Sequence, residues 1–320
     1  MDEVTQTDTP EFEALPQRRG SQWIFIGENG LRAGWSALVF VAIFIALEAL
    51  YAVTLGPFFH SHMDMNAPLG PGIAILQEAI QLILMLVATA IMAQIEKRKI
   101  AVYGYSGSAR FSRFVCGLLW GIIAISVLIG ILWKGHLLAF DGSPLSGFSV
   151  WKYAAAWAFF FLIVGLFEES LLRGYLQYTL TRGIGFWWSA LLLSALFGLV
   201  HKGNVGESPV GLFSAAAVGL VFCLSLWYTG SLWWAIGFHA AWDWGQTYLY
   251  GTSDSGMMAK GHFLSEHPTG PLLWTGGATG PEGSLWIVPL LLIMPLLMWL
   301  WWGRRAVAPL KQGPVAIAES

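Results

Sequence analysis

The sequence predicts an all-α, polytopic membrane protein with about eight transmembrane helices. Hydrophobic residues make up 56% of the 320 residues and charged residues only 11%, whereas soluble domains carry about 25% charged residues. The mean hydropathy is +0.61. Apolar runs that approach or exceed the roughly 20 residues needed to cross a bilayer recur along the chain. Together these observations favour a membrane-embedded helical bundle.

Eight apolar stretches are predicted to be helices: 31–55, 69–95, 114–133, 151–180, 186–201, 210–228, 232–250 and 285–302. The connections 181–185 and 229–231 are short, so helices four to seven should form two antiparallel hairpins. The fourth helix is too long to lie wholly in hydrocarbon, because 30 residues rise about 45 Å. One of its ends should therefore project beyond the bilayer.

The chain divides into a transmembrane domain and two polar tails. We expect residues 1–30 to form a cytosolic tail, 31–303 the eight-helix domain with a motif core at 151–250, and 304–320 a second cytosolic tail. Lys and Arg concentrate in alternate loops, which by the positive-inside rule places both termini in the cytosol. The longest opposite loop, 251–284, is expected to be solvated, with a lid over the site as the alternative.

Charged residues inside the fourth helix are the first functional signal. Glu168, Glu169 and Arg173 lie in an apolar run, where each charge costs about 2.5–3.5 kcal/mol at a membrane midplane. Glu169 and Arg173 are four residues apart and can pair on one helix face. Glu168 is rotated by about 100° and is left for another role.

Two later apolar helices add further polar residues at the same spacing. Phe197 and His201 are four residues apart, as are His239 and Asp243, so each pair shares one helix face. Helices four, five and seven are thus predicted to surround a common cavity. Buried polar residues also tie membrane helices together, but a packing network rarely needs so many titratable groups on three helices.

These residues suit either of two chemistries. Glu168, His201 and His239 could hold a zinc ion with one position open for water. Alternatively, Glu168 could act directly as a general base on water with help from a histidine, while the remaining His and Asp stabilise the oxyanion. The sequence leaves both open. Two further acids within the apolar helices, Glu48 and Glu78, are expected to form interhelical hydrogen bonds, with a substrate-path role as the alternative.

The three motifs together resemble those of one protease family. Glu168-Glu169-x-x-x-Arg173, Phe197-x-x-x-His201 and His239-x-x-x-Asp243 are similar, in order and spacing, to the motifs of the CPBP family of CAAX-processing and bacteriocin-processing (Abi) intramembrane proteases. This family includes the type II CAAX prenyl endopeptidases. The opening segment 24–35 also looks like bacterial members, which implies a bacterial inner-membrane location.

The resemblance implies a role for each motif residue. Glu168 and His201 would activate water, and His239 with Asp243 would form the oxyanion side. Glu169 and Arg173 would be a structural ion pair, and Phe197 would wall the site. The third motif often ends in Asn in this family, and here it ends in Asp243. An ionised Asp would be a poor hydrogen-bond donor to an oxyanion.

The predicted function is therefore an intramembrane endopeptidase acting on a peptide or lipidated protein at the lipid bilayer, with no nucleic-acid partner. The principal alternative is a non-catalytic immunity or scaffolding protein of the same fold. A proton or small-solute transporter that uses the buried acids as a relay is a third reading, but no inverted repeats are visible.

Overall fold

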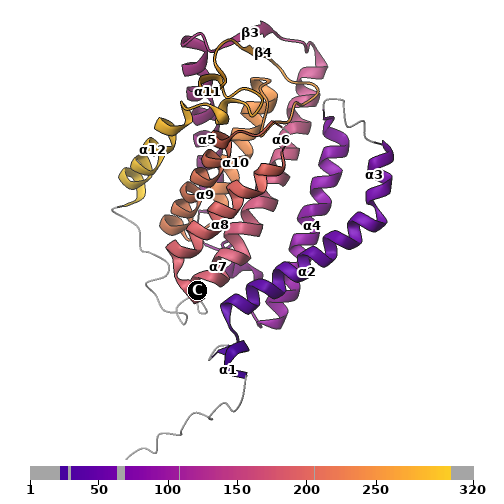
Figure 1. The fold of residues 1–320 in the computed structure, drawn as a ribbon, viewed down its shortest axis with the longest axis vertical. Coiled ribbons are helices and arrows are strands. Elements are labelled where there is room, and N and C mark those ends of the chain that lie inside the picture. The colour runs from indigo at the N-terminus through magenta and orange to yellow at the C-terminus, as the bar shows by residue number, and fades with distance from the viewer. Residues whose placement is uncertain (1–21, 28–29, 63–68, 108, 205, 304–320) are drawn as a thin grey trace, which may run out of the picture.

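The computed structural model describes residues 22–27, 30–62, 69–107, 109–204 and 206–303. Long helices form a bundle that is covered at one end by a loop and a short β-ribbon (Figure 1). The predicted cytosolic tail 304–320, and residues 1–21 and 28–29 of the predicted N-terminal tail, lie outside the described part of the chain.

The helices and strands follow in chain order: α1 (Gln22–Phe25), β1 (Ile26–Gly27), β2 (Gly30–Leu31), α2 (Ala33–Thr54), α3 (Gly56–His62), α4 (Pro71–Ile95), η1 (Ile100–Val102), α5 (Arg110–Lys134), β3 (Leu138–Gly142), α6 (Phe148–Glu169), η2 (Ser170–Leu176), α7 (Gln177–Ile184), α8 (Phe186–Val200), η3 (His201–Gly203), α9 (Pro209–Thr229), α10 (Trp233–Trp244), η4 (Gly245–Leu249), β4 (Ser265–Pro268), α11 (Leu272–Thr275), η5 (Pro281–Gly283), α12 (Ile287–Met298) and η6 (Trp299–Gly303). The fold is mostly helical, which confirms the predicted class.

A helix occurs at each of the eight predicted positions, but the count of eight spans is not confirmed. Within the described ranges, five stretches are long and apolar enough to cross a membrane: α2, α4, α5, Phe148–Ile184 and α9. The predicted spans 186–201, 232–250 and 285–302 correspond to α8, α10 and α12, which are shorter. The predicted ends of these stretches nevertheless lie close to the observed ones, because η4 continues α10 to Leu249 and η6 continues α12 to Gly303.

Glycines allow the two central helices to pack closely. Gly117 and Gly121 of α5 face α10, and a Cβ on either would collide with the backbone carbonyl of Trp234 or Phe238. Gly237 of α10 meets the carbonyl of Phe114 in the same way. Small residues four apart are the usual means by which membrane helices approach each other. This contact fixes α10, the helix that carries His239 and Asp243.

A roof loop, defined as residues 251–284, closes one end of the bundle. Its strand β4 pairs antiparallel with β3, with Ala139 opposite His267 and Phe140 opposite Glu266. The loop is fastened to α6 because the indole Nε1 of Trp157 donates to the carbonyl of Lys260 at 3.1 Å. The roof loop is therefore an ordered part of the fold and not the solvated loop that the sequence favoured.

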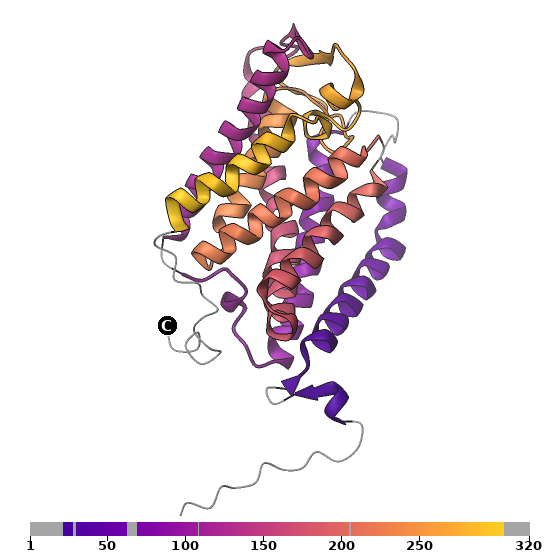
Figure 2. The same cartoon turned by 60° about the vertical axis from the view of Figure 1, so that its left-hand side comes forward.

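The last helix, α12, runs along the side of the bundle and packs against α5 and α9 (Figure 2). Its buried face presents Ile287, Leu291 and Met294 toward the interior. These three apolar side chains line the same internal space as the charged residues of α6 and α10. The bundle thus surrounds one cavity with an apolar side and a polar side.

Candidate active site

The charged motif of α6 lies where the helix changes its winding. Helix α6 ends at Glu169, and Ser170–Leu176 continue it as a wider π-helical turn. Gly174 inside this turn has φ −80° and ψ −106°, outside the helical region, which a residue without a side chain accepts most readily. Such turns are frequent at functional sites. Here the turn follows Glu168 and Glu169 directly and contains Arg173.

Glu169 and Arg173 form the predicted ion pair, fully buried. Arg173 Nη1 donates to Glu169 Oε1 at 3.0 Å, and neither side chain is exposed to solvent. The Arg173 guanidinium lies 4.6 Å from the centre of the Phe197 ring and 5.7 Å from that of Phe222. Cation–π contacts of this kind favour a desolvated guanidinium. Gly219 leaves space for it, since a Cβ there would meet Arg173 Nη2.

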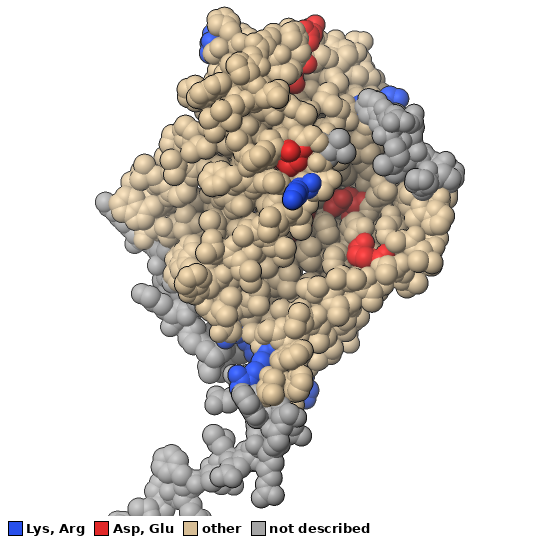
Figure 3. Space-filling view, in the orientation of Figure 1, with Lys and Arg blue, Asp and Glu red and all other residues tan. Residues whose placement is uncertain are grey.

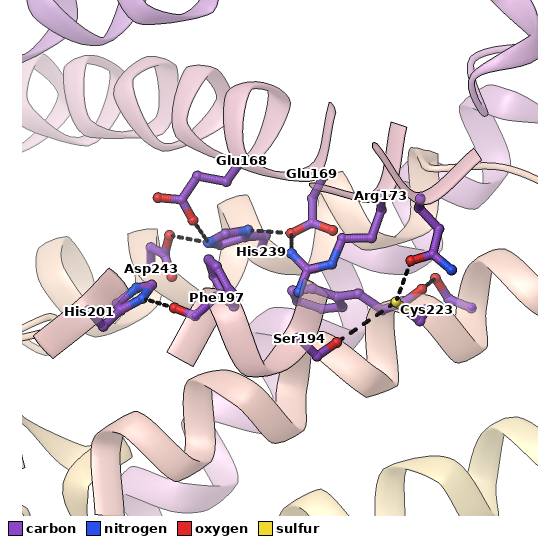
Figure 4. Close-up of polar contacts among 12 residues, drawn as sticks. Glu168, Glu169, Arg173, Ser194, Phe197, His201, Cys223, His239 and Asp243 are labelled. Carbon is purple, nitrogen blue, oxygen red and sulfur yellow. Dashed lines mark hydrogen bonds and ion pairs between the residues drawn. The ribbon is translucent and has the colours of Figure 1, made fainter. Parts of the chain in front are cut away.

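His239 stands at the centre of three carboxyl groups (Figure 4). Its Nδ1 is 3.1 Å from Glu169 Oε1, the same oxygen that Arg173 holds. Its Nε2 is 3.6 Å from Glu168 Oε2 and 3.4 Å from Asp243 Oδ2. A carboxylate paired with Arg accepts hydrogen bonds, so Nδ1 carries a proton and Nε2 faces the other two acids. The structure thus brings motif one and motif three together.

His201 lies apart from this group. Its Nδ1 is 2.7 Å from the carbonyl of Phe197, one turn earlier, so Nδ1 donates and Nε2 is free to accept. Among the described residues, the ion pair of Glu168 is with His239, and none joins Glu168 to His201. The Phe197 ring lies near both histidines, with its centre 4.7 Å from His201 and 6.3 Å from His239. The Phe197 side chain is also part of the cavity lining.

The predicted metal set is not assembled in this arrangement. Within the described part of the chain, no group of three or more His, Cys, Asp and Glu side chains is placed to hold a metal ion. Glu168 and His239 are close to each other, whereas among the described residues no hydrogen bond or ion pair joins His201 to either of them. The present geometry therefore does not fit a zinc site made of Glu168, His201 and His239.

A cavity of about 250 Å³ opens onto these residues. Its polar wall includes Glu168, His239 and Asp243, and its apolar wall comes from α9 and α12. Figure 3 shows a hollow on this face with acidic side chains inside it. Pockets that combine an apolar lining with a few convergent polar groups are the usual form of substrate sites.

The roof loop contributes two acids to the cavity. Asp254 accepts a hydrogen bond from Thr247 Oγ1 at 3.1 Å, and Glu282 accepts from the backbone N–H and the hydroxyl of Ser255 at 2.7 and 2.8 Å. Burial raises the pKa of Asp254 well above its usual range and also raises the pKa of Glu282. Both groups line the cavity beside Asp243. The loop is therefore a wall of the site.

Sequence reasoning missed or undervalued three contributors. Phe222 of α9 stacks on His239 with ring centres 5.6 Å apart. Glu78 of α4 lines the cavity, although interhelical hydrogen bonding was its expected role. The acids of the roof loop carry no motif. Only Glu78 had a signal in the sequence, namely a carboxylate within an apolar helix.

Comparison with known proteins agrees with the motifs. A search of curated proteins gives no match. Residues 149–245, which carry all three motifs and run from α6 through α10, match the family described as "Type II CAAX prenyl endopeptidase Rce1-like". By this segment the protein matches the Rce1-like type II CAAX prenyl endopeptidases, the family that the three motifs predict.

Proposed function

We propose that this protein is an intramembrane endopeptidase that cleaves a peptide bond of a membrane-associated substrate with water activated by side chains. The observation that carries the proposal is the position of His239, which Glu169 holds and which lies beside Glu168 and Asp243 in the wall of a cavity. A general base, an oriented imidazole and an enclosed pocket are the parts that hydrolysis requires.

Glu168 is the proposed general base. Its side chain is 27% exposed, in contrast to the fully buried Glu169, so water can reach it. It would take a proton from water while the water oxygen attacks the scissile carbonyl carbon. His201 would assist through Nε2, which its bond to Phe197 leaves free to accept.

His239 is the proposed oxyanion donor. Glu169 fixes the ring through Nδ1, so a proton on Nε2 can be donated to the carbonyl oxygen as negative charge develops there. Asp243 Oδ2 lies 3.4 Å from Nε2, within ion-pair distance, so Asp243 would help to hold a charged His239 ring in place rather than contact the oxyanion. This assigns a positioning role to the residue that departs from the family's common Asn.

The fold suggests a lipid-associated substrate and an orientation in the membrane. The apolar wall of Ile287, Leu290 and Met294 suits an apolar group such as a prenyl chain or an apolar side chain. Basic side chains gather at the end of the bundle away from the roof loop (Figure 3). We therefore propose that both termini face the cytosol of a bacterial cell and that the roof loop faces the opposite side.

The test is cleavage of a quenched, farnesylated CAAX peptide by purified protein in detergent. Glu168→Ala and His201→Ala should each lower the rate by at least about 100-fold, the usual size of a general acid–base contribution. His136→Asn is the matched control, because His136 is exposed and is not among the residues that line the cavity. Its backbone has φ 55°, which Asn tolerates, so wild-type activity is expected.

The outcomes separate the readings. Equal cleavage by wild type and both variants would contradict the protease proposal and favour the non-catalytic scaffolding alternative. A parallel assay with chelator addresses the metal question. Loss of activity that zinc restores would assign a metal that the present geometry does not accommodate, whereas indifference to chelator would support direct catalysis by Glu168.

A further inference from the structure

Glu78 lies in the lining of the same cavity as the motif residues but belongs to a different helix. It belongs to α4, which packs against α6 and contributes no residue to the three motifs. Its carboxyl group lines the cavity together with Glu168 and His239, and it lies within electrostatic range of both. Placing an acidic side chain among apolar membrane helices costs free energy, and such residues usually have a functional role.

The Glu78 carboxyl is not committed to holding the fold together. Among the described residues it has no hydrogen-bond or ion-pair partner, in contrast to the other acids that line the cavity. Glu169 is bound to Arg173, Asp254 to Thr247, and Glu282 to Ser255. Interhelical hydrogen bonding therefore does not account for Glu78.

Hydrolysis of an amide needs a proton donor in addition to a base. The leaving nitrogen must be protonated as the carbon–nitrogen bond breaks, because an amide anion is too basic to leave. Glu168 and His239 serve the attacking water and the oxyanion on the α6 and α10 side. A second carboxyl group from a separate helix would supply the proton without displacing either, as paired acids do elsewhere.

We propose that Glu78 is a catalytic residue that protonates the leaving amine, which extends and rests on the proposed protease function. Glu168 takes a proton from water as the oxygen–carbon bond forms. Glu78, in its acid form, gives its proton to the nitrogen as the carbon–nitrogen bond breaks. Transfer of the proton from Glu168 to Glu78, directly or through cavity water, then restores both groups. One water is consumed, and one acid and one amine are released.

Replacing the leaving group provides the test. In the same farnesylated peptide, the scissile amide is replaced by a thioester. A thiol has a pKa near 8.5, so it departs as the thiolate and needs no proton donor. Glu78→Gln keeps the size of the side chain and removes its exchangeable carboxyl proton. We expect it to slow amide cleavage by about 100-fold or more and thioester cleavage by less than about threefold.

Glu48→Gln is the matched control. Glu48 lies on the neighbouring helix α2, is also an acid within an apolar span, and does not line the cavity. The same substitution there should leave both rates close to those of wild type. Glu78→Asp, which keeps a carboxyl group but shortens its reach, should recover part of the amide rate. Retained thioester cleavage in Glu78→Gln would also show that the variant is folded.

The comparison distinguishes failure of this assignment from failure of the protease proposal. Equal losses on amide and thioester in Glu78→Gln, with Glu168→Ala inactive on both, would overturn the role of Glu78 and leave the protease standing. The same holds if Glu78→Gln cleaves the amide at the wild-type rate. An amide rate in Glu168→Ala equal to that of wild type would overturn both proposals.

Discussion

Two clusters of charged residues flank the π-helical turn Ser170–Leu176, and they use similar partners in different surroundings. At one end, Glu169 binds Arg173 and His239. At the other, Glu96 accepts a hydrogen bond from Tyr175 at 2.9 Å and lies 3.4 Å from Arg98 and 3.9 Å from Arg182. We refer to these as the inner and outer clusters.

The clusters differ in their contact with water. In the inner cluster both Glu169 and Arg173 are fully buried, whereas in the outer one the Arg98 and Arg182 side chains are 26% and 24% exposed. A buried pair rarely adds net stability, because desolvation offsets attraction, but breaking it leaves a buried charge. Exposed pairs contribute little and are screened by salt. The inner cluster therefore positions His239, and the outer one fastens a helix end.

The largest expected effect is from breaking the inner cluster. Arg173→Met leaves the Glu169 charge buried without its partner and should destabilise the protein by about 3–5 kcal/mol. Adding Glu169→Gln should recover most of the stability, since no charge is then left unpaired. Cleavage should stay lost in the double variant, because His239 no longer has a carboxylate at Nδ1. Thermal unfolding in detergent measures the change in stability, and peptide cleavage measures the change in activity. A double variant that still cleaves the peptide would contradict the role of Glu169 in positioning His239.

A smaller effect is expected from crowding the same cluster. Gly219→Ala places a methyl group against Arg173 Nη2, and such overpacking costs about 1–3 kcal/mol. Gly130→Ala is the control, because nothing lies within 4 Å of its added Cβ in helix α5. That control should be neutral or stabilised by about 0.5–1 kcal/mol. The unfolding midpoints of Gly219→Ala and Gly130→Ala in detergent test this prediction. Equal midpoints would mean that the packing around Arg173 has room for the added methyl group.

The outer cluster should tolerate change. Glu96→Gln keeps an acceptor for Tyr175 and removes only the attraction to the two arginines, so we expect a loss of about 1 kcal/mol or less. Raising the salt concentration should shrink the difference from wild type. Cleavage should stay within about threefold of wild type, since Glu96 is not among the residues that line the cavity. A loss as large as that of Arg173→Met would show that the two clusters act as one.

The smallest effect concerns charges farther out, on the β3–β4 ribbon. Burial raises the pKa of Glu266 from its ordinary 4.5 to about 7. The unfolded chain therefore releases this proton first, and stability should fall as the pH rises through that window. The hydrogen bond from His267 to Asp141 raises the pKa of His267, so its contribution is also lost as the pH rises. Glu266→Gln should flatten the pH dependence of the unfolding midpoint, and an unchanged slope would contradict this account.

The sequence predicts the helices and the motif residues well because both signals are local. Apolar runs mark α2, α4 and α5, and four-residue spacing places Glu169 with Arg173 on one face. What it does not predict depends on three-dimensional packing. The contact between Glu169 and His239 joins residues 70 positions apart. The stacking of Phe222 on His239 likewise joins separate helices.

Two other differences have physical causes. The roof loop is rich in Gly and Pro, which is typical of solvated loops, yet its fastening to α6 and its pairing with β3 order it. His201 follows the end of α8, which stops at Val200 after 15 residues, so its position depends on where that helix terminates. Spacing places it on one helix face with Phe197, and in the structure its Nδ1 lies 2.7 Å from the Phe197 carbonyl.

The single oxygen Oε1 of Glu169 accepts from both Arg173 and His239, while Oε2 is buried without a partner among the described residues. Two donors that share one acceptor compete for its electron density, so a stronger bond from one weakens the other. The His239 Nδ1 proton is hydrogen-bonded to the fully buried Glu169 side chain. It should therefore give a slowly exchanging, downfield-shifted proton signal in an NMR spectrum. Its chemical shift would then report changes at Arg173, and occupancy of the cavity could be followed spectroscopically without turnover.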